Sequence, residues 1–414
     1  MDHEEAKKPT KFFGLSRNVI SMGAVSFLND LSSDMIFPFI PIFLTTVLGA
    51  SATFIGLIEG IADATASILK IVSGRLSDKW RIRKPFAVFG YSLSAAAKPI
   101  LALASAPWHV LAVRFLDRVG KGTRDAPRDA LLSLSAEKRH IGRAFGFHRG
   151  ADTLGAALGP LIAFAVLPFL GGESESGFRN LFLLSFVASF FAVLILKFSV
   201  REVRNNIDGK EPLFPPKFRF KYLGVPFLIF LAAATIFSLG KASEAFLLLR
   251  AQGLGVAIML LPIIYFVYNI TFALFSTPAG MLSDKIGHRN TFMIGMLIFS
   301  GTYFLFAQAT SSLAMWILFA VYGFYSAFTE GVGRAIVADL VEEKFRATAY
   351  GMYSAFTGFA LLPASLVFGI LWDRFGPSVS FQYGAILGLI AFVIFLFLRL
   401  KNHQKEMNAA STRS

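Results

Sequence analysis

Twelve apolar segments of membrane-spanning length divide this chain of 414 residues. A helix needs about 20 consecutive apolar residues to cross the hydrocarbon core of a bilayer. Only 16% of the residues are charged, whereas a soluble protein has about 25%. The sequence therefore predicts an all-α membrane protein with twelve transmembrane helices, near Val19–Leu48, Thr53–Ser73, Phe86–Leu103, Trp108–Leu134, Ala144–Leu170, Leu181–Val200, Gly224–Leu249, Ile258–Met281, Thr291–Gln308, Ala314–Leu340, Ala349–Trp372 and Phe381–Leu400.

Lysine and arginine are distributed unevenly over the loops between these segments. The loops "DKWRIRKP", "AEKRHIGR", "DKIGHRN" and "EEKFRA" are basic, whereas "GASA", "SAP" and "ATSS" carry no lysine or arginine. Excess lysine and arginine mark the cytoplasmic side of a membrane protein. We therefore expect both termini in the cytoplasm, no removable signal peptide, and a multi-pass protein of the bacterial inner (plasma) membrane. The net charge of +14 follows from this asymmetry, and it favours anionic lipid over nucleic acid as a partner.

Two halves of the chain repeat each other. The segment "GRLSDKWRIRKPF" (Gly74–Phe86) aligns without gaps with "GMLSDKIGHRNTF" (Gly280–Phe292), and "EKRHIGRAFG" is matched by "EEKFRATAYG". Six spans in each copy predict two six-helix bundles that insert in the same direction, with the substrate path between them. The expected domains are a cytoplasmic tail at 1–18, a bundle at 19–200, a cytoplasmic linker at 201–222, a bundle at 223–400 and a cytoplasmic tail at 401–414.

The motif Gly-x-Leu-Ser-Asp-Lys in both copies resembles the loop signature of the major facilitator superfamily, and this resemblance covers Val19 to Leu400. It implies the major-facilitator fold and transport by alternating access. The first copy departs from the family pattern at Arg81, where glycine is usual, while the second keeps Gly287. Plain topology signals would explain the basic residues of the motif, but not its repeated glycine and aspartate. The resemblance implies a cytoplasmic gate that includes Gly74, Asp78, Lys79, Arg83, Gly280, Asp284, Lys285 and Arg289.

The fifth predicted span contains "GADTLGAALGPL", with Gly155, Gly159 and Pro160 in the pattern Gly-x-x-x-Gly-Pro. This pattern is similar to one in proton-coupled drug antiporters of the superfamily. Those proteins usually continue with two glycines, where this chain has Ala163 and Phe164. Small residues four apart also let two helices approach closely. The motif therefore leaves two interpretations open, an antiporter signature and a simple tight helix crossing.

The stretch "RFLDRVGKGTRDAPRDALL", from Arg114 to Leu132, carries eight charged residues within the fourth span. Helical spacing places seven of them on one stripe, and charge at membrane depth normally faces the bundle interior or an aqueous cavity. A helix rise of 1.5 Å puts Arg118 and Lys121 about 16–21 Å into the span. We expect four residues to line a substrate and proton cavity (Arg114, Asp117, Arg118 and Lys121), and three to join the gate or an ordinary helix-end ion network (Asp125, Arg128 and Asp129).

The fragment "GKGT" in this stretch does not indicate a nucleotide site, and the chain is not predicted to be an enzyme. A phosphate-binding loop needs a glycine where the chain has Phe115, and it follows a strand. The sequence contains neither HExxH nor GxSxG.

Acidic and basic partners for the fourth span occur in its neighbours. Membrane-embedded carboxylates are common proton carriers in pumps, although each acid here also fits a buried structural salt bridge. The residues expected to complete the cavity are Asp30 and Asp34 in the first span, Glu59 and Asp63 in the second, and Arg149 and Asp152, beside His148, in the fifth.

The second half differs, because its charges are expected near span ends and its middle is aromatic. Glu330 and Arg334 are assigned to the gate, and Lys241 and Glu244 are also placed at span ends. Between them lie Tyr265, Tyr268, Asn269, Tyr322, Tyr325, Ser326 and Tyr353, which are expected to form an adaptable wall.

These observations predict a proton-coupled secondary transporter that moves a small organic anion or zwitterion by alternating access, with efflux favoured. An alternative in the same class is an importer or exporter of a metal chelate or siderophore, and a different class is a non-transporting membrane receptor. We expect no metal site and no cofactor, with the proton gradient as the energy source. The expected partners are the solute, protons and the lipid bilayer, and we expect a monomer.

Overall fold

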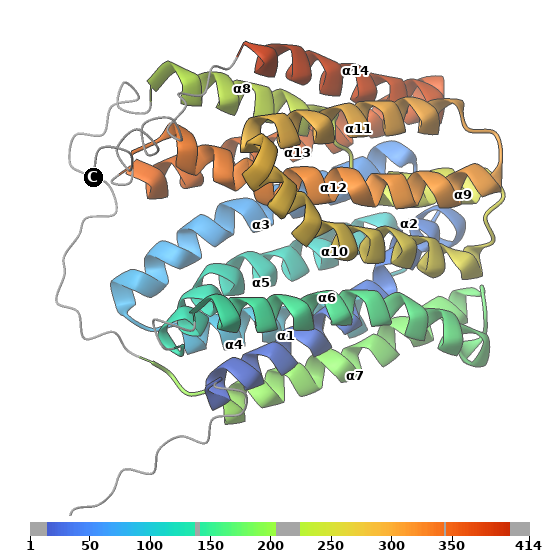
Figure 1. Ribbon diagram of the computed structural model, residues 1–414. Coiled ribbons are helices and arrows are strands. Elements are labelled where there is room, and N and C mark those ends of the chain that lie inside the picture. The colour runs from blue at the N-terminus through green and yellow to red at the C-terminus, as the bar shows by residue number, and fades with distance from the viewer. Residues whose placement is uncertain (1–14, 137–140, 204–223, 343–344, 398–414) are drawn as a thin grey trace, which may run out of the picture. The chain divides into compact units, whose positions relative to one another are not determined.

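The computed structural model describes residues 15–136, 141–203, 224–342 and 345–397 (Figure 1). Most of the predicted tails and linker (1–14, 204–222 and 401–414) lies outside these residues. Within the described part the chain forms helices and no strand, which confirms the all-α prediction. The main helices are α1 (Arg17–Ile36), α2 (Ile40–Ile42), α3 (Ala52–Trp80), α4 (Lys84–Ala102), α5 (Pro107–Leu134), α6 (Ile141–Val166), α7 (Glu175–Ser199), α8 (Gly224–Gly240), α9 (Glu244–Gly253), α10 (Leu261–Ile286), α11 (His288–Gln308), α12 (Ser312–Leu340), α13 (Arg346–Phe375) and α14 (Pro377–Leu396).

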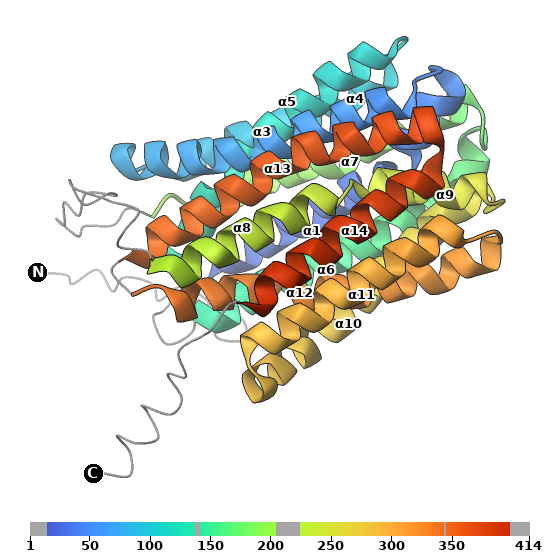
Figure 2. The same cartoon turned by 90° about the horizontal axis from the view of Figure 1, so that it is seen from above.

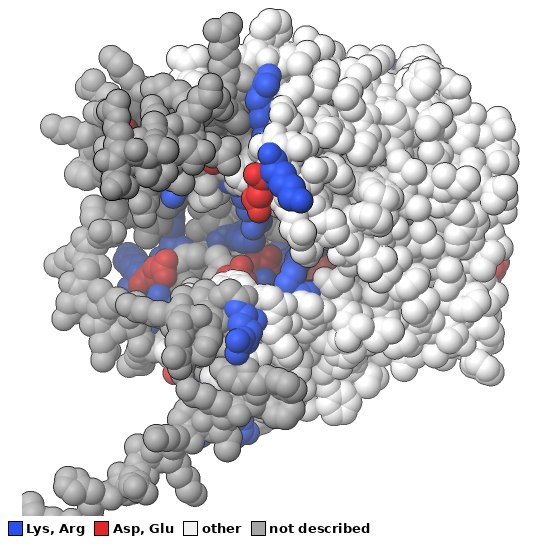
Figure 3. Space-filling model, in the orientation of Figure 1, with Lys and Arg blue, Asp and Glu red and all other residues white. Residues whose placement is uncertain are grey.

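Nine helical segments of the described chain are long and apolar enough to cross a membrane. The other three long helices are α3, α4 and α5, and the eight charges of α5 explain why composition alone does not mark it. Large apolar side chains lie on the outside of the helices, including Phe169 at 88% and Leu313 at 70% exposure. Such an apolar surface suits contact with lipid and would be unfavourable in water. Most of the described surface in Figure 3 is likewise uncharged.

The first and the seventh predicted spans are irregular in their interior. The first continues beyond α1 as a 3₁₀ turn at Phe37–Phe39, then α2, then a π-helical turn at Phe43–Val47. Pro38 and Pro41 explain this irregularity, because proline lacks the N–H that a regular helix needs. The seventh predicted span, expected to be continuous, is divided into α8 and α9 by the non-helical residues 241–243.

The described helices separate into two compact units. Unit 1 contains residues up to 49, 65–210 and 258–266, and unit 2 contains 50–64, 211–257 and residues from 267 onward. The division cuts α3 after Ala64 and α10 after Phe266.

In unit 1, α1 packs against α6 and α7, and α4 packs against α5 and α7 (Figure 1). Gly155 and Gly159 of α6 lie against the backbone of α1. A Cβ atom added to Gly159 would lie 2.5 Å from the Leu31 carbonyl oxygen, and one added to Gly155 would meet the Phe27 carbonyl. These glycines allow α1 and α6 to approach backbone to backbone.

In unit 2, α11 packs against α12 and α14, and α8 packs against α13 and α14 (Figure 2). The core between these helices is aromatic. The ring of Phe299 lies 4.8 Å from that of Phe237 and 4.1 Å from that of Tyr303, centroid to centroid. All three side chains are buried, so aromatic packing contributes much of the stability of this unit.

Candidate functional site

The charged stripe of the fourth span lies on one unbroken helix, α5, in unit 1. Arg114 and Arg124 are buried, at 6% and 5% exposure, whereas Phe115 and Leu116 are exposed at 43% and 36%. Helical periodicity thus separates the buried Arg114 and Arg124 from the exposed Phe115 and Leu116, whereas Lys121 of the same stripe is exposed.

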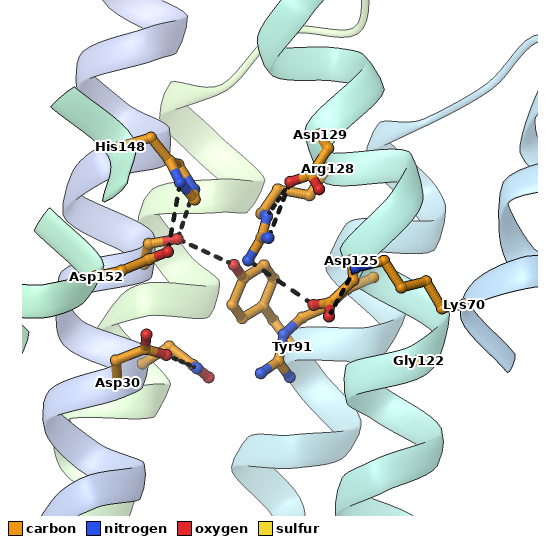
Figure 4. Close-up of polar contacts among 12 residues, drawn as sticks. Asp30, Lys70, Tyr91, Gly122, Asp125, Arg128, Asp129, His148 and Asp152 are labelled. Atoms are coloured by element: carbon orange, nitrogen blue, oxygen red, sulfur yellow. Dashed lines mark hydrogen bonds and ion pairs between the residues drawn. The ribbon is translucent and has the colours of Figure 1, made fainter. Parts of the chain in front are cut away.

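An ion network surrounds Arg128 near the C-terminal end of α5 (Figure 4). Its Nη2 atom lies 2.9 Å from Asp129 Oδ1, and its Nη1 atom lies 3.8 Å from Asp125 Oδ1. Asp125 Oδ2 also lies 3.9 Å from Lys70 Nζ on α3. The structure thus brings together the three residues of α5 that were assigned to the gate. The same geometry suits an ordinary helix-end network.

A polar chain links three helices of unit 1 (Figure 4). His148 Nε2 on α6 lies 2.7 Å from Ser26 Oγ on α1, and Ser26 Oγ lies 3.5 Å from Tyr91 OH on α4. His148 Nδ1 lies 3.6 Å from Asp152 Oδ2. The other oxygen of Asp152 is buried without a hydrogen-bond partner among the described residues. Asp30 belongs to the same cluster, since Asp152 acts on it electrostatically.

Arg124 and Tyr91 connect this chain to α5. The Arg124 guanidinium carbon lies 4.4 Å from the centroid of the Tyr91 ring, within the range of a cation–π contact. Arg124 Nη1 donates a hydrogen bond to Ser94 Oγ at 2.6 Å. Arg124 was on the predicted stripe without an assigned role, whereas Tyr91 and Ser94 carried no signal that sequence reasoning could use.

Lys98 on α4 is a buried cation that sequence reasoning missed, with 3% exposure. It donates hydrogen bonds to Ser32 Oγ at 2.6 Å and to Ser189 Oγ, and Ser189 donates to Ser32 at 2.8 Å. The sequence did contain a signal for it, a single lysine inside an apolar span. An ionisable residue at membrane depth usually has a function.

The remaining expected cavity residues of unit 1 also neighbour one another. Arg114 Nη1 lies 3.9 Å from Asp117 Oδ2. Lys121 and Arg118 act electrostatically on Asp34. Arg149 is exposed and acts on Asp152.

The two expected residues on α3 belong to unit 2. Glu59 is buried at 3% exposure, and its Oε2 atom accepts a hydrogen bond from Ser243 Oγ at 3.3 Å. Asp63 acts electrostatically on Glu244 of the same unit. Their expected pairing with the cations of α5 stays a prediction.

The first copy of the repeated motif contains a short ion pair. Arg83 Nη2 lies 2.9 Å from Asp78 Oδ1. The backbone N–H groups of Arg83 and Lys84 donate to the Glu202 carboxylate at 3.0 and 2.8 Å. Gly74 lies beside Ala126 of α5, since a Cβ there would be 3.2 Å from that side chain. Lys79 is exposed.

The second copy uses a histidine. His288 lies 3.7 Å from Asp284 and 2.6 Å from Asp339, and Arg289 donates to the Leu396 carbonyl at 2.7 Å. Four further residues assigned to the gate are exposed: Gly280, Lys285, Glu330 and Arg334. A gating role for either copy stays a prediction.

The charges in the seventh span differ from expectation. Lys241 and Glu244 were placed near span ends, but they lie at the break between α8 and α9, inside the segment Gly224–Gly253. Across the described residues, no three His, Asp or Glu side chains are grouped to hold a metal ion.

Comparison with known proteins identifies the family of this chain and finds solved structures with a similar fold. The profile described as Major Facilitator Superfamily matches residues 22–269 and 227–414. An uncharacterised MFS-type transporter of Methanocaldococcus jannaschii is 37% identical over 390 residues, which cover 93% of this chain and 95% of that protein. The multidrug resistance protein MdtH of Edwardsiella ictaluri is 28% identical over 165 residues, covering 40% of this chain and 39% of that protein.

Among solved structures, the nucleoside transporter NupG aligns with a TM-score of 0.75 at 15% identity. The alignment covers 92% of this chain and 98% of that one, so the fold is shared along nearly the whole length. The profile match over both halves and the relative matched over 93% of this chain indicate a transporter and not an enzyme. The chain is a transporter of the major facilitator superfamily, an integral multi-pass membrane protein.

Proposed function

We propose that this transporter couples the movement of protons to the movement of a small organic anion or zwitterion by alternating access, with efflux as the favoured direction. We further propose that it lies in the plasma membrane with both termini in the cytoplasm. The similarity of part of the chain to a multidrug resistance protein supports efflux. The basic loops support the orientation.

The observation that carries proton coupling is the polar chain of Asp152, His148, Ser26 and Tyr91. Asp152 has a buried oxygen without a hydrogen-bond partner in the described structure. A buried carboxylate oxygen without a donor makes the anion less favourable, and binding a proton removes this cost. His148 then offers a second group that exchanges protons, at 3.6 Å. This arrangement supports Asp152 as the proton-carrying group and His148 as its relay.

The cations of unit 1 support an anionic or zwitterionic solute. Arg114, Arg118 and Lys121 lie on the stripe of α5, and Lys98 adds a positive charge on α4. Arginine binds carboxylate and phosphate groups through paired hydrogen bonds, and so provides specificity as well as attraction.

The test uses the purified full-length protein in proteoliposomes that contain a pH-sensitive dye. A panel of organic anions and zwitterions is added, and proton movement is recorded with and without an imposed pH gradient. We expect at least one compound to drive proton movement in the wild-type protein. In Asp152→Asn this movement should be lost, while exchange of labelled solute across the membrane continues, because exchange needs no net proton transfer.

The matched control is Glu175→Gln, since Glu175 pairs with Arg179 at 2.7 Å at the start of α7, away from the polar chain. This variant should transport protons as the wild type does. Solute transport that is insensitive to the pH gradient in the wild type would reject proton coupling. Normal proton movement in Asp152→Asn would reject Asp152 as the carrier.

A further inference from the structure

The break in the seventh span places polar groups inside a membrane-spanning segment of unit 2. Residues 241–243 are non-helical, and α9 begins at Glu244 after its N-cap Ser243, whose Oγ accepts a hydrogen bond from Ala245 N at 3.3 Å. Irregular backbone is tolerated at membrane depth only where it is buried in protein or lines a water-filled cavity. In transporters, discontinuous helices of this kind mark binding sites for solutes and ions.

The charges around the break are mainly negative. Lys241, Asp63 and Glu330 act electrostatically on Glu244, so the cluster contains three acidic groups and one basic group. Lys241 and Glu244 are partly exposed and Glu330 is exposed, so a solute can reach them. The C-terminal end of α8 adds a partial negative charge, and the N-terminal end of α9 adds a partial positive charge beside Glu244. The cluster therefore favours additional positive charge.

An aromatic surface faces the same position. Lys241 Nζ lies 5.8 Å from the centroid of the Tyr325 ring, and the Tyr322 ring lies 4.7 Å from that of Tyr325. Both tyrosines are fully buried, and neither hydroxyl makes a hydrogen bond of ordinary geometry within the described part of the chain. Carboxylates combined with the face of an aromatic ring are the groups that recognise an ammonium ion.

We propose that this break binds the ammonium group of a zwitterionic organic solute. Glu244 and Glu330 supply negative charge, the Tyr325 ring supplies the aromatic face, and Lys241 occupies the place of the solute's ammonium group in this structure. The inference rests on the proposed function, in which the solute is anionic or zwitterionic, and it narrows that class to compounds that carry an amine.

The position of Lys241 has a testable consequence. A lysine held over Tyr325 competes with an incoming ammonium ion for the same carboxylates. Replacing it with an uncharged residue should therefore strengthen amine binding. If Lys241 were instead an anchor for a solute carboxylate, the same replacement would weaken binding of carboxylates. The first role predicts tighter binding of amines after the replacement, and the second predicts weaker binding of carboxylates.

The experiment measures equilibrium binding to the purified full-length protein by titration calorimetry. The probes are phenethylamine, which has only the amine, and 3-phenylpropionate, which has only the carboxylate. A charged hydrogen bond contributes roughly 1.5–3 kcal/mol, which corresponds to about tenfold or more in Kd. We expect Lys241→Met to bind phenethylamine about tenfold more tightly, and Glu244→Gln about tenfold more weakly, with no change for 3-phenylpropionate.

Lys241→Arg is the matched control, because it keeps the cation and should bind phenethylamine as the wild type does. The double variant Lys241→Met, Glu244→Gln removes both charges, so it tests the assignment if the single Lys241 variant is unstable. It should lose the gain in affinity for the amine. The proposal is overturned if Lys241→Met leaves amine binding unchanged, if it weakens binding of 3-phenylpropionate, or if phenethylamine binds to neither the wild type nor Lys241→Met.

Failure of this inference is distinguishable from failure of the proposed function. If amine binding changes as expected but the protein moves no protons, the ammonium site is supported and proton coupling is rejected. Proton movement driven only by compounds without an amine rejects the ammonium site and leaves proton coupling in place.

Discussion

At the residue scale, Arg81 adopts a left-handed backbone conformation, with φ at 54°. Gly287 occupies the equivalent position in the second copy of the motif, with φ at 90°. A side chain in this region costs about 1–2 kcal/mol, partly offset by the flexibility that glycine adds to the unfolded chain. We expect Arg81→Gly to stabilise the protein by roughly 0.5–1 kcal/mol, measured as a higher Tm in detergent.

The reverse change at the second copy provides the control. Gly287→Ala introduces a Cβ atom at a residue with a left-handed backbone conformation. The resulting strain should lower the Tm. Gly280→Ala has open space around it and no left-handed backbone, so it should not. An unchanged or lower Tm for Arg81→Gly would mean that the contacts of the arginine side chain outweigh its backbone strain.

At the element scale, the crossing of α1 and α6 depends on glycine. A side chain at position 159 would meet the Leu31 carbonyl oxygen at 2.5 Å and Met35 N at 2.8 Å. Overpacking of this kind costs about 1–3 kcal/mol. We expect Gly159→Leu to lower the Tm and the yield of folded protein, as judged by fluorescence-detected gel filtration. Gly150→Leu on the same helix has nothing within 4 Å and should behave as the wild type. Equal losses in both variants would contradict close packing at Gly159.

Also at the element scale, the start of α3 is capped by a residue of α13. Asp373 accepts hydrogen bonds from Ala52 N at 3.0 Å and from Thr53 N at 2.7 Å. A capping side chain contributes about 0.5–2 kcal/mol, and a carboxylate also interacts favourably with the helix dipole. We expect Asp373→Ala to lower the Tm and to speed hydrogen exchange at Ala52 and Thr53, while Asp373→Asn keeps most of the effect. Exchange that is identical in the wild type and Asp373→Ala would reject the cap.

At the scale of the whole molecule, the distribution of lysine and arginine determines the orientation in the membrane. We expect green fluorescent protein fused to the C-terminus to fluoresce, and alkaline phosphatase fused there to be inactive, if both ends lie in the cytoplasm as proposed. Fusions truncated after Gly172, in a loop predicted to lie outside, should give the opposite pattern. An active phosphatase at the C-terminus would contradict the proposed topology and place the C-terminus outside the cytoplasm.

The sequence by itself determined the fold class and the family. Apolar segments longer than about 20 residues have few alternatives to a transmembrane helix, and the repeated Gly-x-Leu-Ser-Asp-Lys motif identified the superfamily. The sequence also predicted a charged stripe on α5, of which Arg114 and Arg124 are buried, because charge at membrane depth must be sheltered from lipid. Helical periodicity is a local property, so these features could be predicted without knowing which helices are neighbours.

Only the tertiary structure decided which groups meet. His148, Ser26 and Tyr91 form one hydrogen-bonded chain although they lie on three different helices. Lys98 finds its serine partners on α1 and α7. The break at Lys241 contains no proline, and Glu59 reaches Ser243 there from a distant part of the chain. Contacts between helices depend on their rotation and packing, which are set by the whole bundle and not by any one segment.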